Sequence, residues 1–255
     1  MHPTIKYLLA SSLLAAVCAC AKPAPPPAPA ATEASPAMRM LVFTRTTGYR
    51  HDSIPDAVET LRQLARADSI AVDVSEDPAD FNPDNLARYR LVAFANTTGD
   101  VLDPAGRVAM EAFVSAGGGF IGIHSAADTE YDWPWYGELV GAWFKGHPPG
   151  LQTTRVEFDR DGIAPEGRNW TVTDEIYNYR DNPRDRVHVI ASVDEGLYEG
   201  GEMGDDHPIA WCHERNGGRA WYTGLGHDPA LYADATYRRH LARGLRYAAG
   251  LAEEC

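Results

Sequence analysis

Histidine is the residue type in this sequence whose number and placement point most directly to chemistry. The chain holds nine histidines, and five of them fall in polar segments that have the composition of loops: His51, His124, His147, His207 and His227. An imidazole can act as a general acid or base near neutral pH, and it is also a common metal ligand. Several histidines with a carboxylate could therefore move protons or bind a divalent metal such as Zn²⁺.

Two uses of these histidines are open from the sequence. In a metal-free site, His124 and His227 would be the general acid and base, with Glu175 or Asp128 orienting one imidazole. In a metal site, the candidate ligands are His124, His147, His207 and His227. Because no two of them have the His-x-x-x-His spacing of a helix, these ligands would have to converge from different loops.

Residues that could hold a ligand lie near the same histidines. Aromatic rings line many ligand pockets because their faces stack on the apolar faces of a bound molecule. The candidate substrate-binding residues are Arg45, His51, Tyr131, Trp133, Trp135, Tyr177 and Tyr179. The alternatives are structural: the aromatic residues could pack as a lid over a sheet, Arg45 could form a surface ion pair, and His51 could lie at the start of a helix.

The elements that must position these residues alternate between strands and helices in the first half of the chain. Short apolar runs predict strands at residues 40–44, 70–74, 91–95 and 120–123. Amphipathic helices are predicted to begin at Asp52 or Ser53 and at Asp103. This alternation is typical of a parallel sheet covered by helices on both faces. Ligands of such sheets bind beyond the carboxyl ends of the strands, which places the candidate loops at 45–51, 96–100, 124–136 and 225–230.

The second half of the chain is less regular. Strands are predicted at residues 153–158, 187–193, 208–213 and 219–224. A hairpin turn at Asn216-Gly217-Gly218 would join the last two strands, and a helix from about residue 235 to 249 would close the fold. The sequence shows no internal repeat, so we expect one α/β domain.

The segment FIGIHSA, residues 120–126, predicts a strand followed by a sharp turn that exposes one side chain above the sheet. It resembles the nucleophile elbow of the class I glutamine amidotransferases, and His124 stands where those enzymes carry cysteine. Without that thiolate, a glutaminase reaction through a thioester has no nucleophile. Ser125 is the neighbouring hydroxyl, so a serine-dependent amidase is one alternative function.

Several motifs in the same order resemble the ThuA-like (trehalose utilisation) family. They are residues 44–53, 118–126, 174–179, 206–211 and 226–227, and the resemblance extends over about residues 40–250. It implies a flavodoxin-like, class I glutamine amidotransferase-like α/β fold, a three-layer sandwich with a mostly parallel central sheet. It also implies a sugar-directed hydrolase or lyase acting on keto-glycosides or disaccharides. A carbohydrate-binding lipoprotein without catalytic activity is the alternative from a different class.

The N-terminal residues have the features of an export signal. Lys6 precedes an apolar run at residues 7–17, which is too short to span a bilayer core about 30 Å thick. The run ends before Cys20, whose context resembles a bacterial lipobox, and an ordinary cleaved signal peptide is the alternative. The predicted organisation is a signal peptide with lipobox at 1–20, a Pro/Ala-rich tether at 21–38 and a folded domain at 39–251. We expect an exported lipoprotein that faces the periplasm and meets the membrane through its anchor alone.

Charge and cysteine content narrow the partners further. The formal net charge is −13, which argues against a nucleic-acid-binding protein. The family resemblance implies a small carbohydrate as the ligand. Once Cys18 and Cys20 are assigned to the signal region, Cys212 and Cys255 remain. These two could form a disulfide in an oxidising compartment or stay as free thiols, and their positions in the sequence do not decide between the two.

Overall fold

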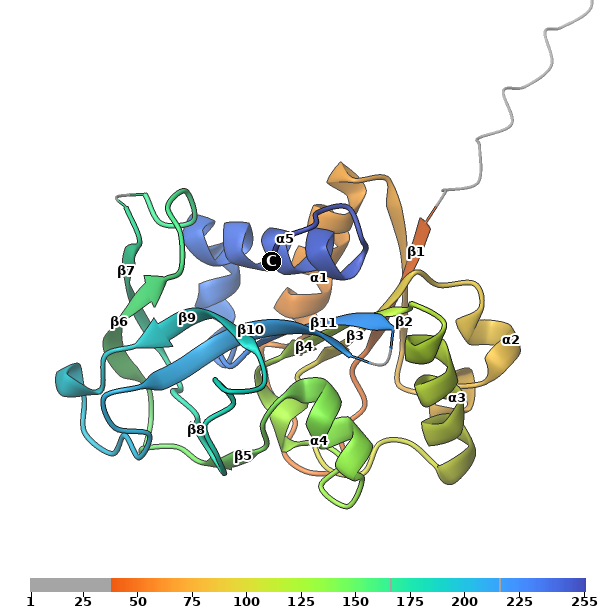
Figure 1. The fold of residues 1–255 in the computed structure, drawn as a ribbon, viewed down its shortest axis with the longest axis horizontal. Coiled ribbons are helices and arrows are strands. Elements are labelled where there is room, and N and C mark those ends of the chain that lie inside the picture. Colours follow the sequence, from red (N-terminus) through yellow and green to blue (C-terminus); the bar gives the residue numbers. More distant parts are fainter. Residues whose placement is uncertain (1–37, 166, 216) are drawn as a thin grey trace, which may run out of the picture. The chain divides into compact units, whose positions relative to one another are not determined.

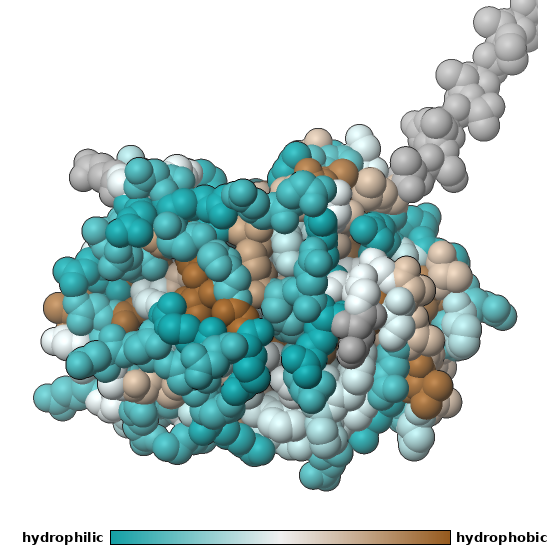
Figure 2. Space-filling model, in the orientation of Figure 1, coloured by the Kyte–Doolittle hydropathy of each residue, from teal (hydrophilic) through white to brown (hydrophobic). Residues whose placement is uncertain are grey.

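The computed structural model describes residues 38–165, 167–215 and 217–255. The predicted signal peptide, the tether up to residue 37 and Asn216 of the predicted hairpin turn lie outside the described residues. Within the described ranges, no helix combines the length and the apolar character needed to cross a membrane. Hydrophilic residues cover most of the face shown in Figure 2, in keeping with the large net charge.

A nine-stranded mixed sheet runs through the described part of the chain (Figure 1). In spatial order its strands are β2 (Ile70–Ser75), β1 (Met38–Phe43), β3 (Leu91–Ala95), β4 (Gly119–Ile123), β11 (Gly218–Thr223), β10 (His207–Arg215), β9 (His188–Val193), β6 (Gln152–Phe158) and β7 (Asn169–Asp174). A separate two-stranded pairing joins β5 (Phe144–Gly146) to β8 (Asn178–Tyr179). The predicted α/β class is confirmed.

The direction of the strands divides the sheet into two halves. From β2 to β11 every neighbouring pair is parallel, and from β11 to β7 every neighbouring pair is antiparallel. Four successive reversals return β7 to the direction of β11. The carboxyl end of β7 therefore lies at the same edge of the sheet as the carboxyl ends of β1, β4 and β11, although β7 is far from them in strand order.

Helices cover both faces of the sheet (Figure 1). On one face lie α1 (Ile54–Ala67) and α5 (Ala235–Ala248), and on the other lie α3 (Pro104–Ser115), α4 (Pro134–Val140) and the short α2 (Pro83–Leu86). The single-turn helices are η1 (Pro78–Asp80), η2 (His124–Asp128), η3 (Glu195–Leu197) and η4 (Pro229–Ala233). Helices α3 and α5 begin close to the residues expected from the sequence, and each has an aspartate cap. The side chain of Asp103 accepts a hydrogen bond from the Gly106 N–H, and Asp234 accepts from the first turn of α5.

The predicted strands and long helices occur within a few residues of their expected bounds, but β7, α4 and the shorter elements β5, β8 and α2 were missed. Strand β7 buries alternate residues, and its last inward position is Asp174, which interrupts the apolar pattern. Helix α4 has seven residues and follows Trp133, so its aromatic residues were assigned to a loop. These errors come from elements too short or too polar to give a clear periodic signal.

Cys212 and Cys255 form a disulfide in the structure. Cys212 lies in β10, so the bond attaches the end of the chain to the middle of the sheet. This settles the alternative that the sequence left open. Disulfides persist in oxidising compartments such as the bacterial periplasm.

Candidate functional site

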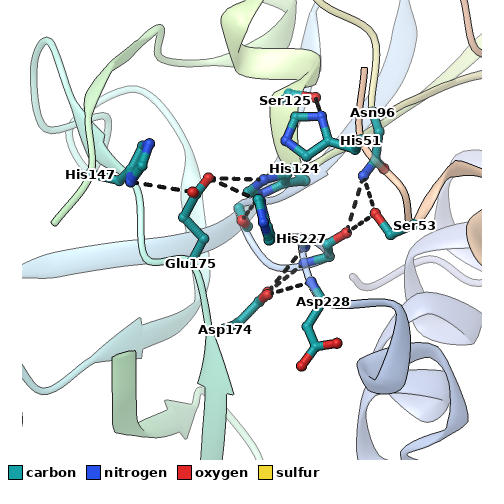
Figure 3. Close-up of polar contacts among 12 residues, drawn as sticks. His51, Ser53, Asn96, His124, Ser125, His147, Asp174, Glu175, His227 and Asp228 are labelled. Atoms are coloured by element: carbon teal, nitrogen blue, oxygen red, sulfur yellow. Dashed lines mark hydrogen bonds and ion pairs between the residues drawn. The ribbon is translucent and has the colours of Figure 1, made fainter. Parts of the chain in front are cut away.

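Four of the residues with the potential for chemistry meet at the carboxyl edge of the sheet (Figure 3). His51 follows β1, His124 begins directly after β4, Glu175 follows β7 and His227 follows β11. Each of the four residues offers one ring nitrogen or carboxylate oxygen, and these four atoms all lie within 4.8 Å of one another. We call these four residues the His₃Glu cluster.

The backbone at the end of β4 aims His124 into this cluster. His124 has φ of 50°, in the left-handed region that L-residues seldom adopt, so the chain turns sharply after Ile123 as the elbow motif predicts. The His124 Nδ1–H donates to the Gly224 carbonyl oxygen at 2.7 Å, because a carbonyl can only accept. The Nε2 atom is then the unprotonated one in the neutral ring, and it faces Glu175.

The contact between His124 and Glu175 therefore lacks a proton or a cation between its two atoms. Nε2 of His124 lies 3.4 Å from Oε2 of Glu175, both side chains are buried, and this nitrogen has no hydrogen-bond partner among the described residues. An imidazole lone pair and a carboxylate oxygen repel each other unless a proton or a cation lies between them. The same carboxylate oxygen is 3.2 Å from Nδ1 of His227, which also lacks hydrogen-bond geometry.

His51 completes the cluster with a ring that is held from behind. Its Nδ1 is 3.3 Å from the hydroxyl of Ser125, so its Nε2 is the nitrogen available to the other members. The ring centroid of His51 is 4.8 Å from that of His124 and 5.1 Å from that of His227. Burial, and after it the charges of the His124 and His227 rings, lower the pKa of His51 to about 3. His51 is thus neutral at physiological pH, as a metal ligand must be.

The loop that carries His227 is fixed by a buried carboxylate. Asp174, which is fully buried, accepts hydrogen bonds from the backbone N–H groups of Gly226 at 2.6 Å and Asp228 at 2.9 Å. The Gly226 carbonyl oxygen in turn accepts from the hydroxyl of Ser53 and from the side-chain amide of Asn96. Burial raises the pKa of Asp174, and the backbone N–H groups only partly offset it.

Glu175 joins the cluster to a fourth histidine. Burial alone would raise the pKa of Glu175, but the imidazoles of His124 and His227 outweigh it and lower that pKa. The Glu175 carboxylate in turn raises the pKa of His227 above its ordinary value of 6.5. The outer oxygen of Glu175 lies 3.2 Å from Nδ1 of His147, which is half-buried and is not part of the His₃Glu cluster.

The structure places the other predicted site residues around or away from this cluster. The ring of Tyr177 packs on His124 with 4.2 Å between centroids, and Asp128 accepts from the Tyr131 hydroxyl at 2.6 Å. Tyr179 is as buried as Tyr177, and its hydroxyl donates to the Tyr222 hydroxyl at 3.4 Å. The remaining four predicted site residues make their contacts elsewhere.

Trp133 and Trp135 stack on each other with 5.0 Å between ring centroids, and the Trp133 indole donates to Glu111. Arg45 donates to the Glu76 carbonyl oxygen at 3.4 Å. His207 is not brought into the metal-ligand set. It is buried, its Nε2 lies 2.9 Å from the Tyr177 carbonyl oxygen, and its Nδ1 lies 2.7 Å from Glu195.

Two of the four cluster members, His124 and His227, were therefore predicted as metal ligands. His51 was predicted to bind substrate and Glu175 to orient an imidazole, and the structure places both among the candidate ligands. The residues that hold the loops, Asp174 and Asn96, were missed. The signal for Asp174 was an acidic residue at an inward strand position, which is unusual unless it is paired.

The four residues fit a divalent transition metal. Imidazole nitrogens and a carboxylate oxygen are ligands that Zn²⁺ binds at about 2.0–2.2 Å, so tetrahedral ligands around it lie about 3.4 Å apart. The 3.4 and 3.2 Å contacts of Glu175 Oε2 match that spacing. The Gly224 carbonyl and the Ser125 hydroxyl hold His124 and His51 through their other ring nitrogens, as residues behind metal ligands commonly do.

Comparison with known proteins gives a consistent picture of the fold. A family model described as ThuA, trehalose utilisation, matches residues 39–248. A protein from Bacteroides uniformis described as ThuA-like is 22% identical with a TM-score of 0.70, over 87% of this chain and 95% of that one. A second, from Parabacteroides merdae, is 18% identical with a TM-score of 0.64, over 83% and 90%.

An α-L-fucosidase from Paenibacillus thiaminolyticus has a TM-score of 0.53 at 13% identity, over 82% of this chain and 33% of that enzyme. At these identities the three structures show a shared fold. A search of curated proteins finds no match to this sequence.

Proposed function

The chain belongs to the ThuA trehalose-utilisation family, and we propose that it is a metal-dependent hydrolase or lyase that cleaves keto-glycosides. The observation that carries the proposal is the buried contact between His124 Nε2 and Glu175 Oε2, which needs a positive charge between its two atoms. Three imidazoles and one carboxylate at metal-ligand spacing supply a site for that charge. The choice of a sugar as substrate follows from the trehalose-utilisation family.

Each residue of the cluster has a distinct task in this proposal. His51, His124, His227 and Glu175 would hold the metal, which when bound polarises a substrate carbonyl or hydroxyl as a Lewis acid. The elbow at His124 and the Asp174-anchored loop at His227 fix two of these ligands before substrate arrives. Preorganised groups of this kind need little rearrangement during reaction.

Asp128 is not one of the proposed metal ligands, and we assign it the role of general base. It lies outside the His₃Glu cluster, four residues after His124, and burial raises its pKa, which makes it a stronger base near neutral pH. In a 3-keto-glycoside the C2–H bond is acidified by the adjacent carbonyl. Asp128 would take that proton, the C–H electron pair would form the C1–C2 double bond, and the glycosidic oxygen would leave with the C1–O electron pair and take a proton from water. Tyr131 fixes Asp128 through its hydroxyl.

A serine-dependent amidase is the alternative with a contact in its favour. Ser125 Oγ lies 3.3 Å from His51 Nδ1, the kind of contact that activates a serine nucleophile. The Ser125 side chain is fully buried, however, and it lies behind the His51 ring as seen from His124 and His227. We therefore assign Ser125 to orienting His51. Loss of amide hydrolysis in Ser125→Ala would reverse that assignment.

The test is metal content followed by turnover. Tag-free protein purified without chelator should hold about one equivalent of zinc or another transition metal, and the His124→Ala/His227→Ala double variant should hold none. His188→Ala is the matched control, because His188 is an exposed imidazole beside Asp159 and should leave the metal in place. Absence of metal from both the wild-type protein and the His188→Ala control would refute the metal site.

Turnover separates the enzyme from a carbohydrate-binding protein. Metal-loaded wild type should cleave 3-keto-glucosides, and the double variant should be inactive. A metal-loaded protein that binds sugar but cleaves no keto-glycoside would support the binding protein instead. The proposed export is supported by the Cys212–Cys255 disulfide, because disulfides persist in oxidising compartments. The proposed lipid anchor is tested by labelling with a radioactive fatty acid in wild type and Cys20→Ala.

A further inference from the structure

We propose that Tyr49 is a stacking platform for a pyranose ring at the entrance to the His₃Glu cluster. The inference rests on the proposed function, because it assigns a substrate contact to the same site. Tyr49 lies in the motif at residues 44–53 but is not among the predicted substrate-binding residues. Its exposure, its position beside His51 and its fixed backbone carry the inference together.

Tyr49 leaves an unusual amount of aromatic surface in water. Its relative exposure is 63%, and the other exposed large apolar side chains in the described residues are aliphatic. Large aromatic side chains normally bury most of their surface, on the order of 150–250 Å² each. An aromatic ring that stays exposed beside a cluster of polar groups has the character of a ligand contact.

The position of Tyr49 connects it directly to the site. Its ring centroid is 4.8 Å from that of His51, and the two rings are nearly perpendicular at 84°. His51 is itself 4.8 and 5.1 Å from the rings of His124 and His227. A molecule that reaches the cluster from this side must therefore pass the ring of Tyr49.

The loop beneath Tyr49 is held rigidly by one threonine. The Thr98 hydroxyl donates to the Tyr49 carbonyl oxygen at 2.8 Å and accepts from the Gly48 N–H at 3.2 Å. The Thr47 N–H donates to the Thr98 carbonyl oxygen at 2.9 Å. A ring on a fixed backbone loses little freedom when a ligand binds, so more of the contact energy appears as affinity.

The surroundings suit a ligand with one apolar face and a rim of hydroxyl groups. Arg50, the residue after Tyr49, forms an exposed ion pair with Glu76 at 2.7 Å, and the two side chains can donate to and accept from hydroxyl groups. A pyranose has this combination of an apolar C–H face and hydroxyl edges. The aromatic residues expected to stack on sugar are engaged elsewhere: Trp133 and Trp135 with each other, and Tyr177 beneath His124.

The test measures sugar binding separately from metal binding and turnover. Trehalose and methyl α-D-glucopyranoside are the probes, titrated into zinc-loaded protein and followed by saturation-transfer NMR. Tyr49→Ala should raise the Kd at least about tenfold, or about 1.4 kcal/mol, whereas Tyr49→Phe and Tyr49→Trp should stay within about twofold. Leu197→Ala is the control, because it removes an exposed apolar side chain on η3.

Two results would overturn the inference: unchanged affinity in Tyr49→Ala, or wild-type protein that binds neither sugar. Zinc content should be the same in all of these variants, since Tyr49 is not a ligand. With a cleaved keto-glucoside, Tyr49→Ala should raise KM with little change in kcat. Sugar binding that depends on Tyr49, without turnover, would refute the proposed function but support the stacking role of Tyr49. Turnover with a KM and Kd unchanged in Tyr49→Ala would support the proposed function and refute the stacking role.

Discussion

Asp174→Asn tests how the fold holds the loop of His227. Both oxygens of Asp174 accept backbone hydrogen bonds, one from Gly226 at 2.6 Å and the other from Asp228 at 2.9 Å, and the His227 N–H lies 3.4 Å away. Asparagine keeps one accepting oxygen. Its amide nitrogen would face N–H groups that can only donate, in a place without access to water.

The expected effect follows from the number of donors left unpaired. Leaving a buried N–H without a partner costs about 1–3 kcal/mol, so with one or two affected donors we expect a loss of about 2–4 kcal/mol in the free energy of unfolding. Typical domains have about 5–15 kcal/mol in total. Because the same loop presents His227, metal affinity should fall about 10–100-fold, as it does when groups that orient metal ligands are changed.

Urea unfolding of metal-free protein measures the first effect, and competition with a chromophoric chelator measures the second. Asp77→Asn is the control: Asp77 is an exposed cap that accepts from the Ala79 N–H at 2.9 Å, and asparagine caps about as well, so the change should stay under about 0.5 kcal/mol. If Asp174→Asn matched this control in stability and kept wild-type metal affinity, the carboxylate would not be what holds the loop. A loss of stability without a loss of metal affinity would break the proposed link to His227.

Three further predictions follow from other parts of the structure. Reduction of the Cys212–Cys255 disulfide, whose cysteines are 43 residues apart, should cost about 4 kcal/mol by loop entropy and lower Tm by about 8–16 °C, and a Tm unchanged by reductant would contradict it. Metal-free protein should lose stability as pH rises above 6.5, because the raised pKa of His227 means its contact with Glu175 is fully present only below that value. Zinc-loaded protein should instead gain stability, because protons compete with the metal for its ligands. Thermal unfolding from about pH 6.5 to 8 should therefore show opposite trends for the two forms, and parallel trends would refute the shared site. Gly226→Ala should destabilise by more than about 1 kcal/mol, because φ is 129° and a Cβ would lie 2.7 Å from the Tyr232 and Tyr237 hydroxyls, whereas Gly146→Ala, with open space around it, should not; urea midpoints of the two variants decide this.

The strands that could be predicted from the sequence are those buried on both faces. All five residues of β3 and all five of β4 are buried, so each appears as a continuous apolar run bounded by polar loops. Strand β7 is covered on one face and ends in Asp174, and its outward residues are polar. Its local signal is only the short alternation of Trp170 and Val172 with polar residues. Its place in the sheet is decided by pairing with β6, which comes from elsewhere in the chain.

The site was predictable to the same extent and for the same reason. His124 and His227 directly follow strands whose ends are marked in the sequence, so their convergence could be expected. His147 and His207 both precede proline, which restricts the backbone to extended conformations but does not set the direction of the side chain. The structure turns His147 toward the outer oxygen of Glu175 and buries His207 against Glu195. Two histidines with the same local signal therefore have different surroundings.

The two adjacent acids after β7 show how one strand end can serve both the fold and the site. Strand geometry alternates side chains, so Asp174 continues the inward face and meets the N–H groups of the His227 loop. Glu175, the next residue, leaves the strand and points to the histidines. A one-residue shift in the pairing of β7 with β6 would exchange these positions and remove both the anchor and the ligand. Strand β7 is the last strand of the antiparallel half of the sheet. Its register thus decides whether the histidines at the ends of the parallel strands have a carboxylate partner.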